Sequence, residues 1–163
     1  MDASATKGTK TGTSATAGIF SVSGISTAGL NAKLENVDSI HSFISNNESE
    51  FDDKNFYRLL NTLIAESGKS KGKIAADSWI SEPYMYNLIK GEKRPARDTV
   101  IKLSFGLQLP LATTERLLKL AGYDVFYVRR KRDAILKFAF QKSLGITEAE
   151  ELLLEYGLSI LEE

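Results

Sequence analysis

Few residues in this chain have the types and spacing that catalysis or metal binding requires. The chain has 163 residues, no cysteine and a single histidine, His41. Neither a thiolate metal site nor a nucleophile–histidine–acid set is therefore expected. Two acidic pairs, Asp52/Asp53 and Glu150/Glu151, are typical of the negatively charged first turn of a helix. We expect no enzyme activity, no metal and no cofactor.

A fragment of a phosphate-binding loop occurs at residues 68–70, Gly-Lys-Ser. The complete loop needs another glycine five residues before Gly68, and Leu63 occupies that position. Leu63 also belongs to a helical pattern, whereas such loops follow a strand. The fragment therefore gives no support for nucleotide binding.

The segment ISEPYMYNLIKGEKRP, residues 80–95, combines polar, aromatic and basic side chains that suit contact with nucleic acid. Ser81 can accept a hydrogen bond from a first-turn amide, and Pro83 fits that first turn because its missing N–H is not needed there. Gly91 is expected to end this helix. A shorter helical pattern starts at Ser70. Two short helices joined by a turn of three or four residues form a helix-turn-helix.

This region resembles the XRE-type helix-turn-helix domains of phage repressors and Cro. The resemblance covers residues 54–110, about a third of the chain. The residues that carry it are Ser70, Ala75, Ile80, Ser81, Met85, Leu88, Gly91 and Pro95, followed by the apolar helix of Val100, Ile101 and Leu103. It implies a five-helix bundle that binds double-stranded DNA, with a recognition helix at about residues 81–90 in the major groove.

The resemblance also implies which side chains contact DNA: Lys71, Ser81, Glu82, Pro83, Tyr84, Asn87, Lys93 and Arg94. Lys71 would approach a phosphate at the start of the first motif helix. Lys93 and Arg94, in the turn after the recognition helix, would hold the DNA backbone.

Base edges would be contacted by Glu82, Tyr84 and Asn87. Asn87 suits a bidentate contact to adenine, and Glu82 can accept from cytosine N4, although a carboxylate is repelled by phosphates. Pro83 would touch a thymine methyl or stiffen the helix. Trp79 departs from the family pattern, because a small residue usually makes this turn. Its ring is expected to pack inward or to distort the start of the second helix.

Residues 1–30 are expected to form a disordered arm, because 21 of them are Ser, Thr, Gly or Ala. The apolar residues of this arm are Ile19, Phe20, Val22 and Ile25. They make it either a linker or a segment that becomes ordered on a protein partner such as a toxin or a kinase.

The rest of the chain is predicted to be all-α, because apolar residues recur at helical spacing and no strand pattern of useful length occurs. Residues 31–53 are assigned to an amphipathic helix, with Asn31 as its N-cap, and a linker. Residues 54–126 are assigned to the DNA-binding domain and residues 127–163 to an additional αα-hairpin.

That hairpin repeats an earlier part of the sequence. Residues 97–126 and 132–161 match at a shift of 35, with nine identical positions, and each copy is predicted to be helix, short loop, helix, glycine and apolar tail. We expect the two hairpins to stack. The basic run 129–132 is either a solvent-exposed first turn or a second phosphate contact.

Charge is distributed unevenly along the chain. The net charge is zero, but residues 56–110 carry nine basic and five acidic side chains. No apolar run is long enough to span a membrane. The resemblance to XRE-type domains implies a cytoplasmic, dimeric DNA-binding transcriptional regulator of bacterial or phage type. The alternative is an antitoxin-like or adaptor protein that controls a partner protein through its arm or hairpins.

Overall fold

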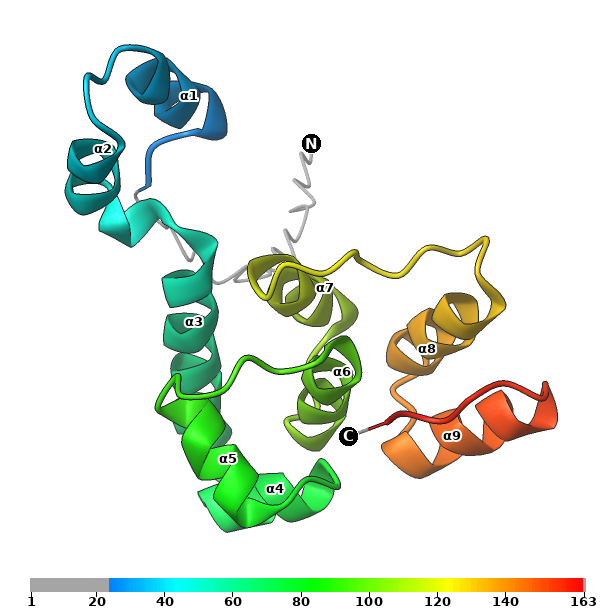
Figure 1. The fold of residues 1–163 in the computed structure, drawn as a ribbon. Helices are drawn as coiled ribbons and strands as arrows, with labels where there is room; N and C mark the ends of the chain where they lie inside the picture. The colour runs from blue at the N-terminus through cyan, green and yellow to red at the C-terminus, as the bar shows by residue number, and fades with distance from the viewer. Residues whose placement is uncertain (1–23, 163) are drawn as a thin grey trace, which may run out of the picture.

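A computed structural model of the chain describes residues 24–162, which form an all-α fold (Figure 1). The elements of this part of the chain are α1 (Thr27–Glu35), α2 (Ile40–Asn46), the 3-10 helix η1 (Glu48–Glu50), α3 (Asp52–Ser67), α4 (Lys71–Asp77), α5 (Glu82–Ile89), α6 (Arg97–Gly106), α7 (Leu111–Leu120), α8 (Lys131–Gln141) and α9 (Ile146–Glu155). No strand occurs within the described residues. The all-α prediction is confirmed.

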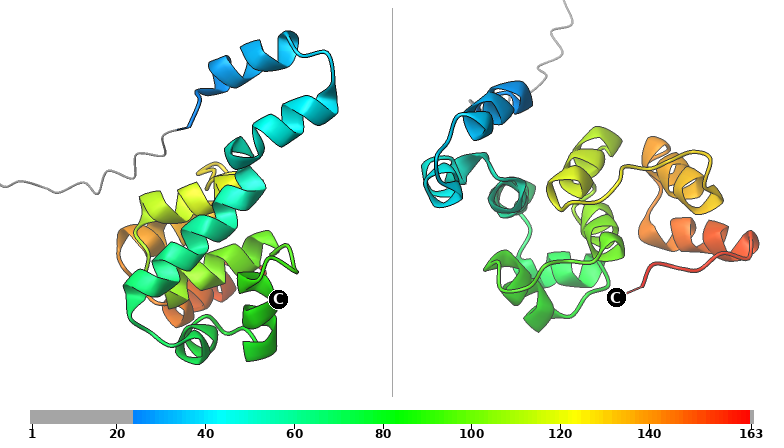
Figure 2. Two further views of the ribbon diagram at one scale, coloured as in Figure 1. Left: turned by 90° about the vertical axis from the view of Figure 1, so that its left-hand side faces the viewer. Right: turned by 45° about the horizontal axis from the view of Figure 1, so that its top comes forward.

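The N-terminal helices differ from the sequence prediction. The hydroxyl of Ser26 accepts from the backbone N–H of Gly29 at 3.1 Å, so α1 begins inside the segment expected to be disordered. Asn31 lies within α1 and is not its N-cap. At the end of α1 the side-chain amide of Asn36 donates to the Ala32 carbonyl at 2.7 Å. Two short helices therefore replace the single predicted one, and Figure 2 shows them projecting beyond the end of α3.

Helix α3 follows the predicted pattern closely. Its apolar stripe includes Phe56, Leu60 and Ile64, all of which are buried. Gly68 ends the helix in the left-handed conformation, with φ at 65°, as the sequence predicted. Helix α3 packs against α5 and α7 and so connects the helix-turn-helix to the repeat.

The 35-residue repeat forms two hairpins whose helix bounds agree to within one residue. Helices α6 and α7 reappear as α8 and α9 at this shift, and the turn residues Gln108 and Ser143 both have φ of 54°. Figure 1 shows α6 and α7 between the α3–α5 unit and the second hairpin. At the contact between the hairpins the equivalent rings of Phe105 and Phe140 stack, with centroids 4.2 Å apart. Equivalent residues meeting in this way indicate a local two-fold relation between the hairpins.

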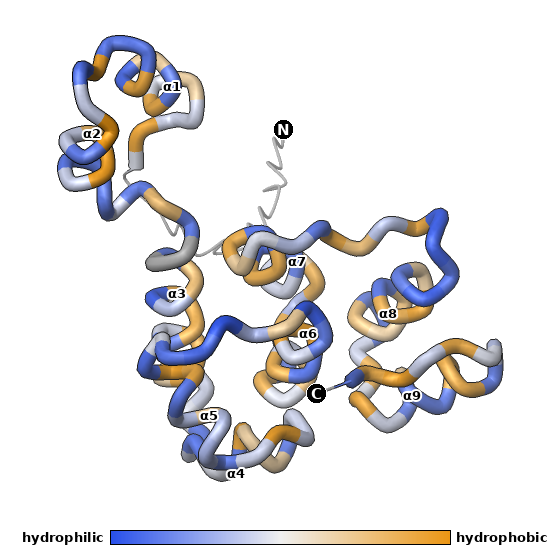
Figure 3. The backbone as a smooth tube through the Cα atoms, in the orientation of Figure 1, coloured by the Kyte–Doolittle hydropathy of each residue, from blue (hydrophilic) through white to orange (hydrophobic). Residues whose placement is uncertain are grey.

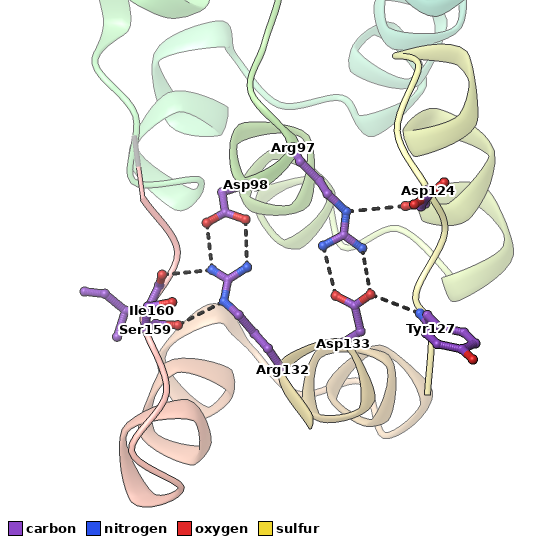
Figure 4. A network of polar contacts seen from close by, with 8 residues as sticks. All are labelled: Arg97, Asp98, Asp124, Tyr127, Arg132, Asp133, Ser159 and Ile160. Carbon is purple, nitrogen blue, oxygen red and sulfur yellow. Dashed lines mark hydrogen bonds and ion pairs between the residues drawn. The ribbon is translucent and has the colours of Figure 1, made fainter. Parts of the chain in front are cut away.

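Two ion pairs cross the same contact (Figure 4). Arg97 donates to both carboxylate oxygens of Asp133, at 2.9 and 3.2 Å. The equivalent Arg132 donates to both oxygens of Asp98, at 3.0 and 2.7 Å. Burial by itself would raise the pKa of Asp98, but hydrogen bonds from Arg132 and from the backbone N–H of Glu162 hold it below its ordinary value. Of the basic run 129–132, Arg132 is therefore a half-buried structural residue, and neither prediction for that run holds for it.

Hydrophobic residues recur along the helices in short intervals, as the orange and blue bands of Figure 3 show. They meet in one core that extends from α3 to α9 and includes Met85, Leu88, Leu117 and Leu136. Within the described residues, no helix is both long enough and apolar enough to cross a membrane.

Candidate nucleic-acid interface

The two helices of the motif begin as the sequence predicted. The Ser70 hydroxyl accepts from the backbone N–H of Lys73 at 3.1 Å and caps α4. The Ser81 hydroxyl accepts from the backbone N–H of Tyr84 at 3.3 Å and caps α5. Pro83 lies in the first turn of α5. Local hydrogen-bonding chemistry thus fixes where both helices start.

The turn between α4 and α5 is closed by two backbone hydrogen bonds. The N–H groups of Trp79 and Ile80 donate to the carbonyls of Ala76 and Ala75, at 3.1 and 3.0 Å, which is the Schellman arrangement. Trp79 occupies its left-handed position, with φ at 53°. Trp79 is 44% exposed. The expectation that this ring packs inward or distorts the second helix is wrong, because the backbone takes the usual turn and Trp79 is exposed.

One face of α5 is held in the core and the other is open. Met85 and Leu88 are fully buried. Glu82, Pro83 and Tyr86 are exposed, whereas Tyr84 and Asn87 are partly buried. Tyr84 packs against the core, so less of it is available for contact than the sequence suggested.

Tyr86 is an exposed aromatic residue that the sequence prediction did not include. Tyr86 is 41% exposed. It follows Glu82 by four residues and Pro83 by three, so helical spacing was the signal that placed it on the open face. The Lys71 ammonium lies 5.5 Å from the centre of the Tyr86 ring, which joins the start of α4 to this face.

The basic residues of the motif fall into two groups. Lys71, Lys90 and Lys93 are exposed and have no ion-pair partner among the residues described by the structure. Lys73 and Lys69 instead pair with Asp77, at 2.7 and 3.1 Å. Their hydrogen bonds, first that of Lys73 and then that of Lys69, hold the pKa of Asp77 below its ordinary value. The first group is available for phosphates, and the second stabilises α4.

Arg94 and Glu82 make contacts within the chain that the sequence did not reveal. The Arg94 guanidinium donates to the carbonyl of Ala121 at 3.0 Å, at the end of α7, and lies 5.8 Å from the centre of the Tyr123 ring. The Glu82 carboxylate lies over the first turn of α4, where a Cβ on Gly72 would be 3.4 Å from it. Both side chains have structural neighbours, and their DNA contacts remain predictions.

Comparisons with known proteins assign neither a family nor a function to the chain. No protein-family model, no curated protein and no solved structure matches the chain. The resemblance to XRE-type domains therefore rests on the motif residues.

Proposed function

We propose that this protein is a sequence-specific DNA-binding transcriptional regulator of bacterial or phage type, acting as a dimer, with α5 in the major groove. The observation that supports it is the capped α4–turn–α5 unit, whose outer face is open while Met85 and Leu88 anchor it in the core. A rigid helix with one open face fits the width of the major groove.

The roles of the side chains follow from this docking. Asn87 and Glu82 lie on α5 where base edges would be, with the amide of Asn87 suited to adenine. Lys71 and Lys93 lie at the two ends of the motif, where phosphates of the groove walls would be. Tyr86 adds an aromatic surface between them.

The test begins with selection of bound sequences from a pool of randomised DNA duplexes. Fluorescence anisotropy then compares the selected duplex with a shuffled one for wild type, Asn87→Ala and Lys93→Ala. Asn87→Ala is expected to lose about 1–3 kcal/mol of discrimination between the two duplexes. Lys93→Ala is expected to weaken both equally and to reduce the salt slope by about one unit.

Lys119→Ala is the matched control, because this exposed lysine lies on α7, outside the motif. It is expected to leave affinity and salt slope unchanged. Equal losses on both duplexes from Asn87→Ala and Lys93→Ala would contradict base recognition by α5.

A second candidate function, an antitoxin-like or adaptor protein, is supported by the N-terminal helices. Leu34, Ile40 and Ile44 are large aliphatic residues with 44%, 54% and 45% of their surface exposed. Ile25 is 40% exposed and borders an open cleft of about 810 Å³ between the start of α1 and helices α3 and α7. Ile19, Phe20 and Val22, the other residues predicted to bind a partner, lie outside the described residues.

This second candidate predicts a surface for a protein partner that is separate from α5. The variant Ile40→Ser/Ile44→Ser is expected to abolish capture of a defined partner, such as a toxin or kinase encoded beside this chain, and to leave DNA binding intact. Unchanged capture by that variant would contradict it.

A further inference from the structure

The two hairpins differ in how many of their faces are covered. Leu103 and Gly106 of α6 form one helical row with Leu107, the C-cap of this helix, and all three are buried. Helix α4 packs against α6, and a Cβ on Gly106 would overlap the hydroxyl of Ser78 at the end of α4. The first hairpin is therefore covered on this outer face by the helix-turn-helix and on its inner face by the second hairpin.

The equivalent row of α8 is not covered by any element among residues 24–162. At the 35-residue shift Leu103 corresponds to Phe138, which is 45% exposed, and Leu107 corresponds to the exposed Lys142. The stripe along α8 consists of Lys131, Ile135, Phe138 and Lys142, at helical spacing. It is apolar at its centre and basic at both ends. The hairpin lies at the end of the molecule away from α3–α5 (Figure 1).

The neighbouring stripe on α9 has the opposite charge. Tyr156 is 63% exposed, whereas its equivalent Ala121 is buried at 7%. Leu152 adds a partly buried apolar residue next to it. Glu151 and Glu155 flank these two residues, and both are exposed without an ion-pair partner in the described part of the chain. The second hairpin therefore exposes apolar residues on both helices, together with basic residues on α8 and acidic residues on α9.

We propose that this outer face of the second hairpin binds the same face of a second copy of the chain, with α8 of each copy against α9 of the other. A two-fold contact must be self-complementary, and this surface meets that requirement because its basic and acidic stripes would exchange partners across the axis. The inner faces of the two hairpins already pair crosswise within one chain, since α6 contacts α9 and α7 contacts α8. This outer face is therefore the interface of the dimer that the proposed DNA-binding function includes.

Sedimentation velocity without DNA tests this surface separately from DNA binding. At about 100 µM the wild-type protein is expected to sediment as a dimer, with twice the 18.0 kDa mass of one chain. Phe138→Glu is expected to raise the dimer dissociation constant by about 100-fold, because it buries an unpaired charge at the centre of the contact. Leu154→Glu is the control, because Leu154 is 63% exposed on α9, against 45% for Phe138, and corresponds to Lys119, which is exposed in the first hairpin.

A charge exchange distinguishes loss of the contact from misfolding. Lys131→Glu/Lys142→Glu and Glu151→Lys/Glu155→Lys are each expected to be monomers alone and to form a heterodimer when mixed. A wild type that is monomeric, a Phe138→Glu variant that still dimerises, or charge variants that do not associate on mixing would overturn the proposal. Dimerisation without DNA binding would leave it standing and would contradict only the proposed function.

Discussion

The two hairpins share a backbone and an inner face but not an outer face. Arg97, Asp98 and Phe105 recur as identical residues in the second copy, and these are the residues that join the copies to each other. The outer row differs, because Gly106 allows α4 to approach closely whereas Gln141 stands in its place and is exposed. Identical positions therefore indicate the contact within the repeat, and differing positions indicate what each copy meets outside it.

The largest expected effect comes from breaking the inner face. Asp133 is almost fully buried and accepts hydrogen bonds from both Arg97 and the backbone N–H of Tyr127. Asp133→Ala is expected to lower the free energy of unfolding by about 3 kcal/mol, because Arg97 loses its partner in a half-buried site. Urea denaturation measures this loss. Asp98 belongs to the second, more exposed ion pair, so Asp98→Ala is expected to lower the free energy of unfolding by less than Asp133→Ala. A larger loss from Asp98→Ala would contradict the assigned burial.

The outer faces of the two hairpins can be compared through substitutions to alanine at the equivalent positions 106 and 141. Gly106→Ala places a Cβ against the Ser78 hydroxyl and 2.9 Å from its backbone nitrogen. The expected loss of unfolding free energy is about 2 kcal/mol, since α4 must move. Gln141→Ala at the equivalent, exposed position is expected to change it by less than about 0.5 kcal/mol. Thermal unfolding of both variants gives the comparison, and equal effects would show that the outer faces do not differ.

A smaller effect is expected at the turns that follow α4, α6 and α8. Trp79, Gln108 and Ser143 each occupy the left-handed position of an equivalent turn without being glycine. Ser143→Gly is expected to raise the unfolding free energy by about 0.5–1 kcal/mol, because relief of the left-handed conformation exceeds the added entropy of the unfolded chain. Chemical denaturation detects this gain. A loss of stability would contradict the strain assigned to these positions.

The smallest expected effect is a change in how the free energy of unfolding depends on pH. Since the pKa of Asp98 is lower in the folded chain, its ion pair contributes stability at neutral pH that is lost as the pH falls below about 4. Asp98→Asn is expected to be less stable than wild type at neutral pH, with the difference narrowing at acidic pH. Urea midpoints measured across this range test it, and a constant difference would contradict the assigned pKa shift.

Local features were predictable from the sequence, and contacts between distant segments were not. The caps Ser70 and Ser81, the stop at Gly68 and the repeat were correctly predicted, because each depends on residues a few positions apart. The partners of Arg94 and Arg132 lie 27 and 34 residues away, and no periodic pattern marks such pairs.

The central claim, that the open face of α5 contacts base pairs, can be tested by crosslinking. The chain has no cysteine, so Tyr86→Cys creates a single attachment point for a photo-crosslinker on that face. Leu154→Cys provides the control on α9, where Leu154 is 63% exposed against 41% for Tyr86. With a selected duplex, crosslinks to bases are predicted from position 86 and none from position 154. A bound complex without crosslinks from position 86, or equal yields from both positions, would contradict the account.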